Sequence, residues 1–229
     1  SFNYLATLGV TSPSTRTIRL RVTDPAGVSN TTSTTLQTLI VDYGDAPASF
    51  GTNRADSGAA HTISNSLKLG PLVDAERNGA PGADANGDDT TGTADEDGVA
   101  FPVPLEAGNV GLLNYVDITS SAAGLVDIWL DLDNNGVFDN GDRLSDAAGF
   151  SVVPGSNRFF FVMPAGTAFG DRSMRFRLST AGGLNPTGRA TDGEVEDYKV
   201  NVRPLSTPVK PTINRPIDVT PTNGVLPQT

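Results

Sequence analysis

The twelve residues from Asp131 to Asp142 combine the side-chain oxygens and the spacing of a calcium-binding loop. Aligned to a twelve-residue loop, they place oxygen side chains at positions 1, 3, 5, 9 and 12. Glycine stands at position 6, where the chain must turn sharply, and a backbone carbonyl at position 7. The expected ligands are Asp131, Asp133, Asn135, Val137 through its carbonyl, Asp139 and Asp142. Because calcium binds six to eight hard oxygens, the spacing predicts Ca²⁺ as a cofactor.

Two features of this loop differ from the loop of a helix–loop–helix calcium-binding motif. A strand pattern precedes it, and position 12 is Asp142, whose side chain is shorter than the glutamate that normally binds through both oxygens. A weaker or differently closed site is therefore expected. The alternative is a hairpin turn at Asn135-Gly136 between two strands, with acids that merely face water.

A second acidic tract runs from Asp74 to Asp97 and contains a single basic residue, Arg77. Like charges at this density repel one another unless a cation lies among them. The candidate ligands in this tract are Asp84, Asn86, Asp88, Asp95 and Asp97. No strict twelve-residue register fits, so the alternative is a solvated acidic loop.

A third cluster begins at Asp192 and enters the last strand pattern of the chain. Alternation directs Glu194 and Glu196 to one side of that strand, where they are candidate metal ligands, and Val195 and Asp197 to the other. The alternative is an acidic strand edge, which discourages pairing with further strands.

These clusters lie between runs of period-two alternation, which is typical of half-buried strands. In residues 15–24, Ile18, Leu20 and Val22 alternate with Arg19 and Arg21, which predicts a strand with one face in the core and one face exposed to solvent. The same alternation recurs at residues 126–133, and further strands are expected at residues 157–163 and 198–202.

Residues 174–178 follow the same rule, with Arg175 and Arg177 expected on the wet face. Asp makes up 21 of the 26 acids and competes for its own backbone, so almost no helix is expected. Short strands with loop-rich joins predict an all-β fold, an antiparallel β-sandwich of jelly-roll or immunoglobulin-like type with long calcium-binding loops.

Composition excludes several classes of function. The formal net charge of −10 argues against a nucleic-acid binder. The chain has no cysteine and a single histidine, His61, which excludes disulfides, thiol catalysis and a histidine-rich zinc site. No apolar run is long enough for a transmembrane segment. His61 has no recognisable nucleophile beside it, so it is expected to be structural and the protein is not expected to be an enzyme.

The chain divides into three regions. Residues 1–41 hold too few strands for a complete immunoglobulin-type domain, so they are expected to end a preceding sandwich or to be shared with a neighbour. Residues 42–203 form the main domain. Residues 204–229 contain six prolines, which favour an extended arm.

The string from Gly193 to Tyr198 resembles the signature of the GEVED domain, a β-sandwich module of secreted and surface-attached bacterial proteins. Four further segments agree with the family and occur in its order: residues 42–47, 72–76, 95–99 and 129–133. The resemblance covers about residues 42–203. It implies an extracellular location at the bacterial cell surface and acids that bind calcium, and it implies no particular activity.

The last residues, Leu226-Pro227-Gln228-Thr229, resemble the LPxT part of a sortase sorting signal after cleavage. A sortase-type transpeptidase would join the Thr229 carboxyl to an amine. The candidate acceptors are the Ser1 amino group, Lys68, Lys199 and Lys210. The expected partners are thus the sortase and copies of this chain or other surface proteins, joined covalently. The alternative is a sequence that ends within a linker.

The first hypothesis is therefore a non-enzymatic structural protein of the cell surface, such as a stalk, an adhesin or a fibre subunit, stabilised by calcium. The alternative is a calcium-dependent module that binds a glycan or a protein through exposed aromatic side chains. A hydrolase with catalytic acids is the third reading, and strand exchange between chains through residues 1–41 is the fourth.

Overall fold

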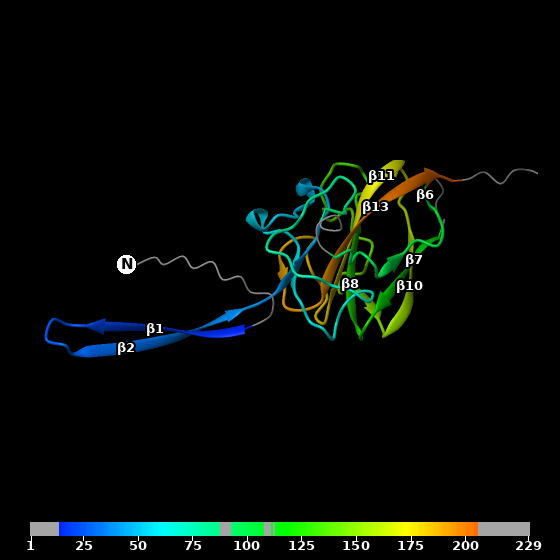
Figure 1. Ribbon diagram of the computed structural model, residues 1–229. Helices are drawn as coiled ribbons and strands as arrows, with labels where there is room; N and C mark the ends of the chain where they lie inside the picture. Colours follow the sequence, from blue (N-terminus) through cyan, green and yellow to red (C-terminus); the bar gives the residue numbers. More distant parts are fainter. Residues whose placement is uncertain (1–13, 88–92, 108–110, 112, 206–229) are drawn as a thin grey trace, which may run out of the picture.

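The computed structural model of the protein describes residues 14–87, 93–107, 111 and 113–205. These residues form a long hairpin and a rounded body of strands and loops (Figure 1). The hairpin projects from one side of the body, and the last described strand runs toward the opposite side. The expected arm beyond residue 205 lies outside the described residues.

The hairpin pairs β1 (Ser14–Thr23) with β2 (Ser29–Thr38) in an antiparallel register from Ser14↔Thr38 to Thr23↔Ser29. The turn forms because Asp24 Oδ1 accepts hydrogen bonds from the backbone N–H groups of Ala26 and Val28, each at 2.9 Å. Gly27 supplies the left-handed conformation that the turn requires, with φ of 84°.

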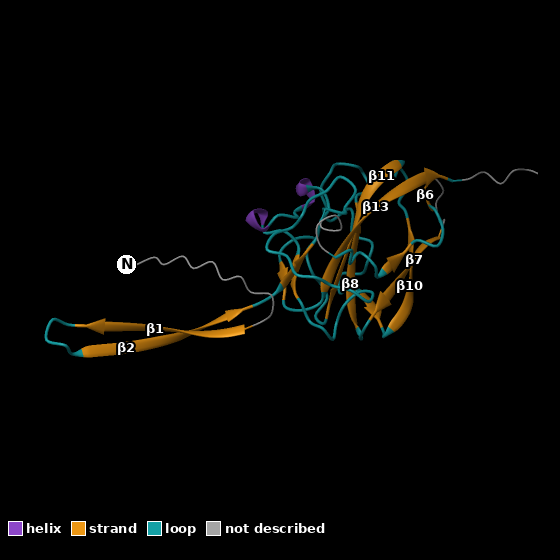
Figure 2. Cartoon of the chain, in the orientation of Figure 1, coloured by secondary structure: helices purple, strands orange, loops and turns teal. Residues whose placement is uncertain are grey.

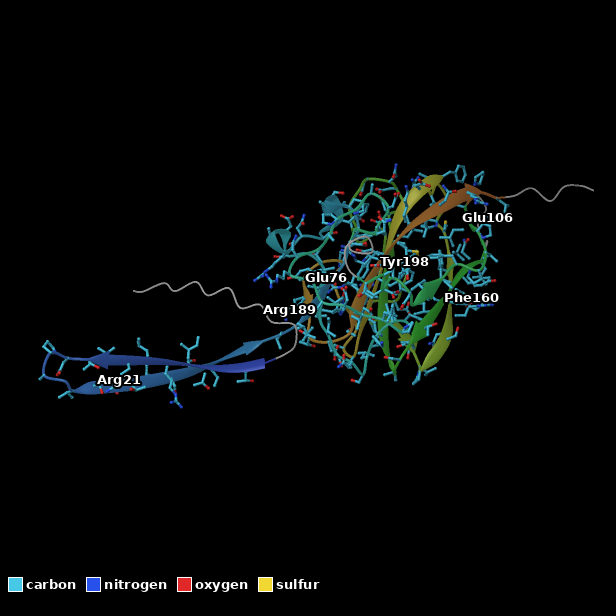
Figure 3. All side chains as sticks on the ribbon, in the orientation of Figure 1. Arg21, Glu76, Glu106, Phe160, Arg189 and Tyr198 are labelled. Atoms are coloured by element: carbon cyan, nitrogen blue, oxygen red, sulfur yellow. The ribbon has the colours of Figure 1, made fainter. Side chains whose placement is uncertain are left out.

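The alternation of β1 predicted the strand correctly, but the expectation of a covered core face was wrong. Ile18, Leu20 and Val22 are 52, 60 and 61% exposed. Arg19 and Arg21 on the opposite face are exposed as well, and Figure 3 shows Arg21 on the projecting hairpin. The physical reason is topological, because β1 and β2 pair only with each other among the described strands.

The body is built on two sheets, which confirms the all-β sandwich-like fold (Figure 2). The smaller sheet has the order β10-β7-β5, and the larger has the order β6-β13-β11-β8-β9. All pairs are antiparallel except β13 with β6, which is parallel. The smaller sheet comprises β5 (Val99–Ala100), β7 (Leu113–Ser120) and β10 (Gly155–Val162). The larger comprises β6 (Leu105–Ala107), β8 (Gly124–Leu130), β9 (Phe150–Val152), β11 (Gly170–Ser179) and β13 (Glu194–Pro204).

The main core consists of the facing side chains of these two sheets. The alternate residues Met174, Phe176 and Leu178 of β11 are fully buried in it. They lie in one apolar cluster with Ile118 of β7 and Phe161 of β10. The expected scarcity of helix is confirmed within the described residues, where the helices are two single 3₁₀ turns, η1 (Ala48–Phe50) and η2 (Arg54–Asp56). None of the described helices is long and apolar enough to cross a membrane.

The opposite face of the larger sheet is covered too, and the expectation of a wet face there was wrong. Arg175 and Arg177 are 0 and 1% exposed, because the segments on either side of a third small sheet fold over them. That sheet has the order β12-β4-β3 and comprises β3 (Val41–Tyr43), β4 (Ala60–Thr62) and β12 (Arg189–Ala190). A second apolar cluster lies under this cover: Ala46, Phe50, Trp129 and Phe138.

Candidate metal centre

The predicted calcium loop starts directly after β8 and turns sharply at Asn134 and Gly136, as the position of the glycine predicts. Asp131 is 1% exposed, and its two carboxylate oxygens accept the backbone N–H groups of Asn135 at 3.1 Å and Gly136 at 3.2 Å. Asn134 and Gly136 have φ of 62° and 82°, the left-handed conformation of a sharp turn. The chain therefore wraps around the Asp131 carboxylate.

Asp142 closes this loop from the other end. Its Oδ1 accepts the N–H of Leu132 and its Oδ2 accepts the N–H of Asp139, both at 2.9 Å. Asp131, Asp133 and Asp142 each present a carboxylate oxygen within 4.8 Å of the other two. Burial raises the pKa of both Asp131 and Asp142, against the lowering effect of the N–H groups that bind them.

The remaining predicted ligands of the loop lie nearby but differ in orientation. Asn135 directs its Nδ2 group toward Asp133 Oδ2 at 3.1 Å and Asp139 Oδ2 at 3.5 Å, and its Oδ1 accepts the N–H of Val137. Asp139 is exposed, and its Oδ1 accepts the N–H of Gly141 at 2.6 Å. The structure thus gathers three of the predicted carboxylates, while the Asn135 oxygen serves the loop backbone.

The predicted ligands of the second acidic tract do not converge on one point. Asp84 and Asn86 are exposed, and Asp84 pairs with Lys199 at 2.7 Å. Asp97 is exposed, and its Oδ1 accepts the N–H of Leu72 at 3.4 Å. Asp88 lies outside the described residues.

Asp95 belongs to a second carboxylate group that sequence reasoning did not assemble. Asp42, Glu76 and Asp95 each present an oxygen within 4.8 Å of the other two. Asp42 and Asp95 are 2 and 4% exposed. The signals were present in the sequence, since Asp42 sits in an apolar strand between Val41 and Tyr43, but nothing in the spacing linked it to Glu76.

Glu76 is held against another acid. Its Oε2 accepts the N–H of Tyr43 at 2.7 Å, while its carboxyl lies within hydrogen-bonding reach of Asp74. Burial, contact with Asp74 and the charge of Asp42 raise the pKa of Glu76 to about 11. Two carboxylates in contact require a proton or a cation between them.

The segment from Gly193 to Asp197 is buried rather than exposed, so its interpretation as an acidic strand edge was wrong. Glu194, Glu196 and Asp197 are 0, 1 and 0% exposed. Glu196 Oε1 accepts the N–H groups of Asp97 and Gly98, at 3.2 and 2.8 Å, and Glu194 Oε2 accepts the N–H of Leu69 at 2.5 Å. These acids dock the preceding segment onto β13.

Burial sets the ionisation of these two glutamates. Burial, followed by the charges of Asp42 and Glu196, raises the pKa of Glu194 to about 12. Burial raises the pKa of Glu196 to about 8, against the lowering effect of the Gly98 N–H and the Tyr198 hydroxyl. The hydroxyl of Tyr198 donates to Glu196 Oε2 at 3.0 Å.

The other side of the same strand holds a buried ion pair. Arg175 donates through Nε to Asp197 Oδ1 at 2.7 Å and through Nη2 to Asp197 Oδ2 at 2.8 Å. Both side chains are fully buried. Arg175 Nη1 also donates to the carbonyl oxygens of Phe50 and Pro186, each at 2.9 Å, so the pair fastens two loops to the sheet.

His61 lies within this covered face and has partners that suit a structural role. Its Nδ1 lies 2.8 Å from the carbonyl oxygen of Asp192, and its Nε2 accepts a hydrogen bond from Arg177 Nε at 3.0 Å. This pattern assigns the proton of the neutral ring to Nδ1. Burial, followed by the charge of Arg177, lowers the pKa of His61 well below its usual value.

The amines proposed as covalent acceptors are only partly described. Lys199 Nζ contacts Asp84 at 2.7 Å and Asp171 at 3.2 Å, and Lys68 Nζ donates to the carbonyl oxygen of Pro71. Ser1, Lys210 and the attachment residue Thr229 lie outside the described residues, so the covalent linkage stays a prediction.

Residues 125–201 match the family model of the GEVED domain, and this range covers most of β8, the predicted calcium loop and most of β13. No curated protein and no solved structure shows a significant match to the chain.

Proposed function

We propose that this chain, whose residues 125–201 match the family model of the GEVED domain, is a non-enzymatic structural module of the bacterial cell surface whose β-sandwich is stabilised by calcium. The observation that carries the proposal is the closed loop from Asp131 to Asp142. Three of its acids converge, two of them buried, in the register of a calcium-binding loop.

Calcium in this loop would act on stability through Phe138. This side chain is 8% exposed and packs against Phe50, with ring centroids 4.6 Å apart. Phe138 belongs to the apolar cluster with Trp129, beneath the loops that cover the larger sheet. An ion that fixes the loop therefore also fixes Phe138, and through it the packing of the loop against Phe50 over the larger sheet.

A non-enzymatic role is supported by how the buried acids are used. Glu196 and Asp197 each accept backbone N–H groups of segments far away in sequence, and Asp197 also pairs with Arg175. Such acids are bound to the fold and are not aimed at a substrate. The single histidine is likewise enclosed by Arg177 and a backbone carbonyl.

The test is the effect of calcium on thermal unfolding. An extracellular site with a dissociation constant of about 0.1 to 1 mM adds roughly 1 to 2 kcal/mol at several millimolar calcium. For a domain of this size that corresponds to a rise in Tm of roughly 2 to 8 °C over the chelated protein.

The matched variants are Asp133→Asn and Asp146→Asn. Asp133 is exposed and belongs to the carboxylate group, so its replacement should remove the part of the calcium effect that belongs to the loop. Asp146 is an exposed acid just beyond the loop, and its replacement should leave the effect intact. Equal calcium responses of the wild type and Asp133→Asn would refute the proposed loop site.

A second candidate function is binding of a glycan or protein partner through the outer face of the smaller sheet. Tyr115 and Phe160 are cross-strand partners with ring centroids 5.7 Å apart, and Arg158 lies 4.1 Å from the Tyr115 ring. Phe160 is 51% exposed and lies on the side of the body away from the hairpin (Figure 3). Aromatic side chains presented in this way suit sugar stacking. If the wild type bound a glycan on an array and Phe160→Ala bound it equally well, glycan binding through this face would be excluded.

A further inference from the structure

The acids Asp42, Glu76 and Asp95 meet from three separate parts of the chain. Asp42 lies in β3, Glu76 near the start of the second acidic tract, and Asp95 near its end, just ahead of β5. Each has an oxygen within 4.8 Å of the other two. Oxygens that bind one calcium ion at 2.3 to 2.6 Å lie no more than about 5.2 Å apart, so one ion can contact all three.

Backbone groups hold these three carboxylates in place. Asp42 Oδ2 accepts the N–H of Val195, Glu76 Oε2 accepts that of Tyr43, and Asp95 Oδ2 accepts that of Asp74, each at 2.7 Å. The donors come from different segments, so each acid is oriented by tertiary structure. A preformed group of this kind loses little conformational entropy when it binds an ion.

Glu194 provides an independent sign of a ligand. Its side chain is 0% exposed, and among the described residues its Oε1 has no hydrogen-bond partner. Asp42 Oδ2 accepts the N–H of Val195, the residue that follows Glu194, so Glu194 lies beside the acidic group. A fully buried carboxylate oxygen without a donor, next to an acidic group, fits a missing positive charge.

The contact between Asp74 and Glu76 points the same way. Among the described residues, neither Asp74 Oδ1 nor Glu76 Oε1 has a hydrogen-bond donor, although the two carboxyls lie against each other. None of the five ion pairs of the described residues involves Glu76 or Glu194. The ligand chemistry is oxygen alone, which favours calcium over zinc.

We propose that Asp42, Glu76 and Asp95 bind one calcium ion beside the buried Glu194, and that this ion fastens β3 and the segments around Glu76 and Asp95 to β13. This second site goes beyond the proposed loop site and stands without it. All three ligands precede residue 125, where the family match begins. The ion would therefore make the segment that precedes the family match part of the folded unit.

The experiment is isothermal titration calorimetry of the chelator-treated chain with calcium alone at neutral pH. The test variant is Glu76→Gln, because the amide keeps an acceptor for the Tyr43 N–H and can donate to Asp74. The control is Glu106→Gln on β6, an equal change of charge at a glutamate that lies at the far end of the body from Glu76 (Figure 3). Asp133→Asn reports on the loop site.

Wild type and Glu106→Gln should bind two equivalents of calcium, and Glu76→Gln and Asp133→Asn one each. The double variant of Glu76 and Asp133 should bind none. Two equivalents in Glu76→Gln would overturn the second site and leave the loop site standing. Two equivalents in Asp133→Asn would overturn the loop site alone. A wild type that binds one equivalent, lost only in Asp133→Asn, would mean that the buried acids share protons, and would also overturn this inference.

Discussion

Replacing Asp197 by asparagine tests whether the buried ion pair holds the cover of the larger sheet. The Asp197 carboxylate accepts hydrogen bonds from Nε and Nη2 of Arg175, and its Oδ2 also accepts the N–H of Ala46 at 2.9 Å. Asparagine has nearly the same shape but no charge. Arg175 would then remain buried, 0% exposed, with carbonyl oxygens as its other main partners.

The magnitude follows from the burial of the pair. Removing one partner of a fully buried ion pair costs about 3 to 5 kcal/mol, because the other charge stays in the interior without compensation. At roughly 2 to 4 °C per kcal/mol for a domain of this size, Tm should fall by roughly 10 °C.

The assay is urea unfolding followed by the fluorescence of Trp129, the single tryptophan, which is 1% exposed in the apolar cluster under the same loops. The control is Asp117→Asn. Asp117 pairs with Arg158 through two contacts of 2.7 and 2.9 Å, but the Arg158 side chain is 47% exposed. Solvent screens that pair, so its loss should cost far less.

Two outcomes would refute this reasoning. If Asp197→Asn were as stable as the wild type, the pair would not compensate a buried charge. If Asp197→Asn and Asp117→Asn lost equal stability, the number of hydrogen bonds rather than burial would determine the cost.

Two further predictions concern the same region. Gly193→Ala should lose more than roughly 3 kcal/mol, because φ is 86° and the new Cβ would lie 1.8 Å from a backbone oxygen. Gly166→Ala, with φ of 92° and open space, should lose only the roughly 1 to 2 kcal/mol of backbone strain, and urea midpoints compare the two. Lowering the pH below about 6.5 should destabilise the wild type, because the lowered pKa keeps folded His61 neutral while the unfolded chain binds a proton. Its contribution is present above pH 6.5 and falls by about 1.4 kcal/mol per pH unit below it. His61→Gln should lose this part of the slope of unfolding free energy against pH, and an unchanged slope would contradict it.

Much of the fold could be predicted because a half-buried strand is recognisable from the alternation of apolar and polar residues within its own sequence. The alternation of Met174, Phe176 and Leu178 identifies a strand and its core face from adjacent residues alone. The loop from Asp131 to Asp142 could be located for the same reason, since the hydrogen bonds that the Asp131 and Asp142 carboxylates accept join residues at most ten apart.

The burial of the polar faces could not be predicted from local pattern. Arg175 and Arg177 read as solvent-facing because alternation reports the two faces of a strand and not what covers them. Two of the groups that cover them, the Phe50 carbonyl and the His61 ring, lie more than one hundred residues away in sequence. The group of Asp42, Glu76 and Asp95 could not be predicted for the same reason. Its members are distant in sequence, and only tertiary folding brings Asp42 of β3 into contact with Val195.

The register of β13 determines how the body would respond to tension along the chain beyond Pro204. Nine residue pairs, from Gly170↔Val202 to Leu178↔Glu194, join β13 to its antiparallel neighbour. β6 runs parallel to the end of β13, from Val202↔Leu105 to Pro204↔Ala107. A pull along the strand axis strains all of these ladders in shear at once, whereas a pull across it would break them one bond at a time. Because the ladders share the load, the strand would resist extraction as a unit.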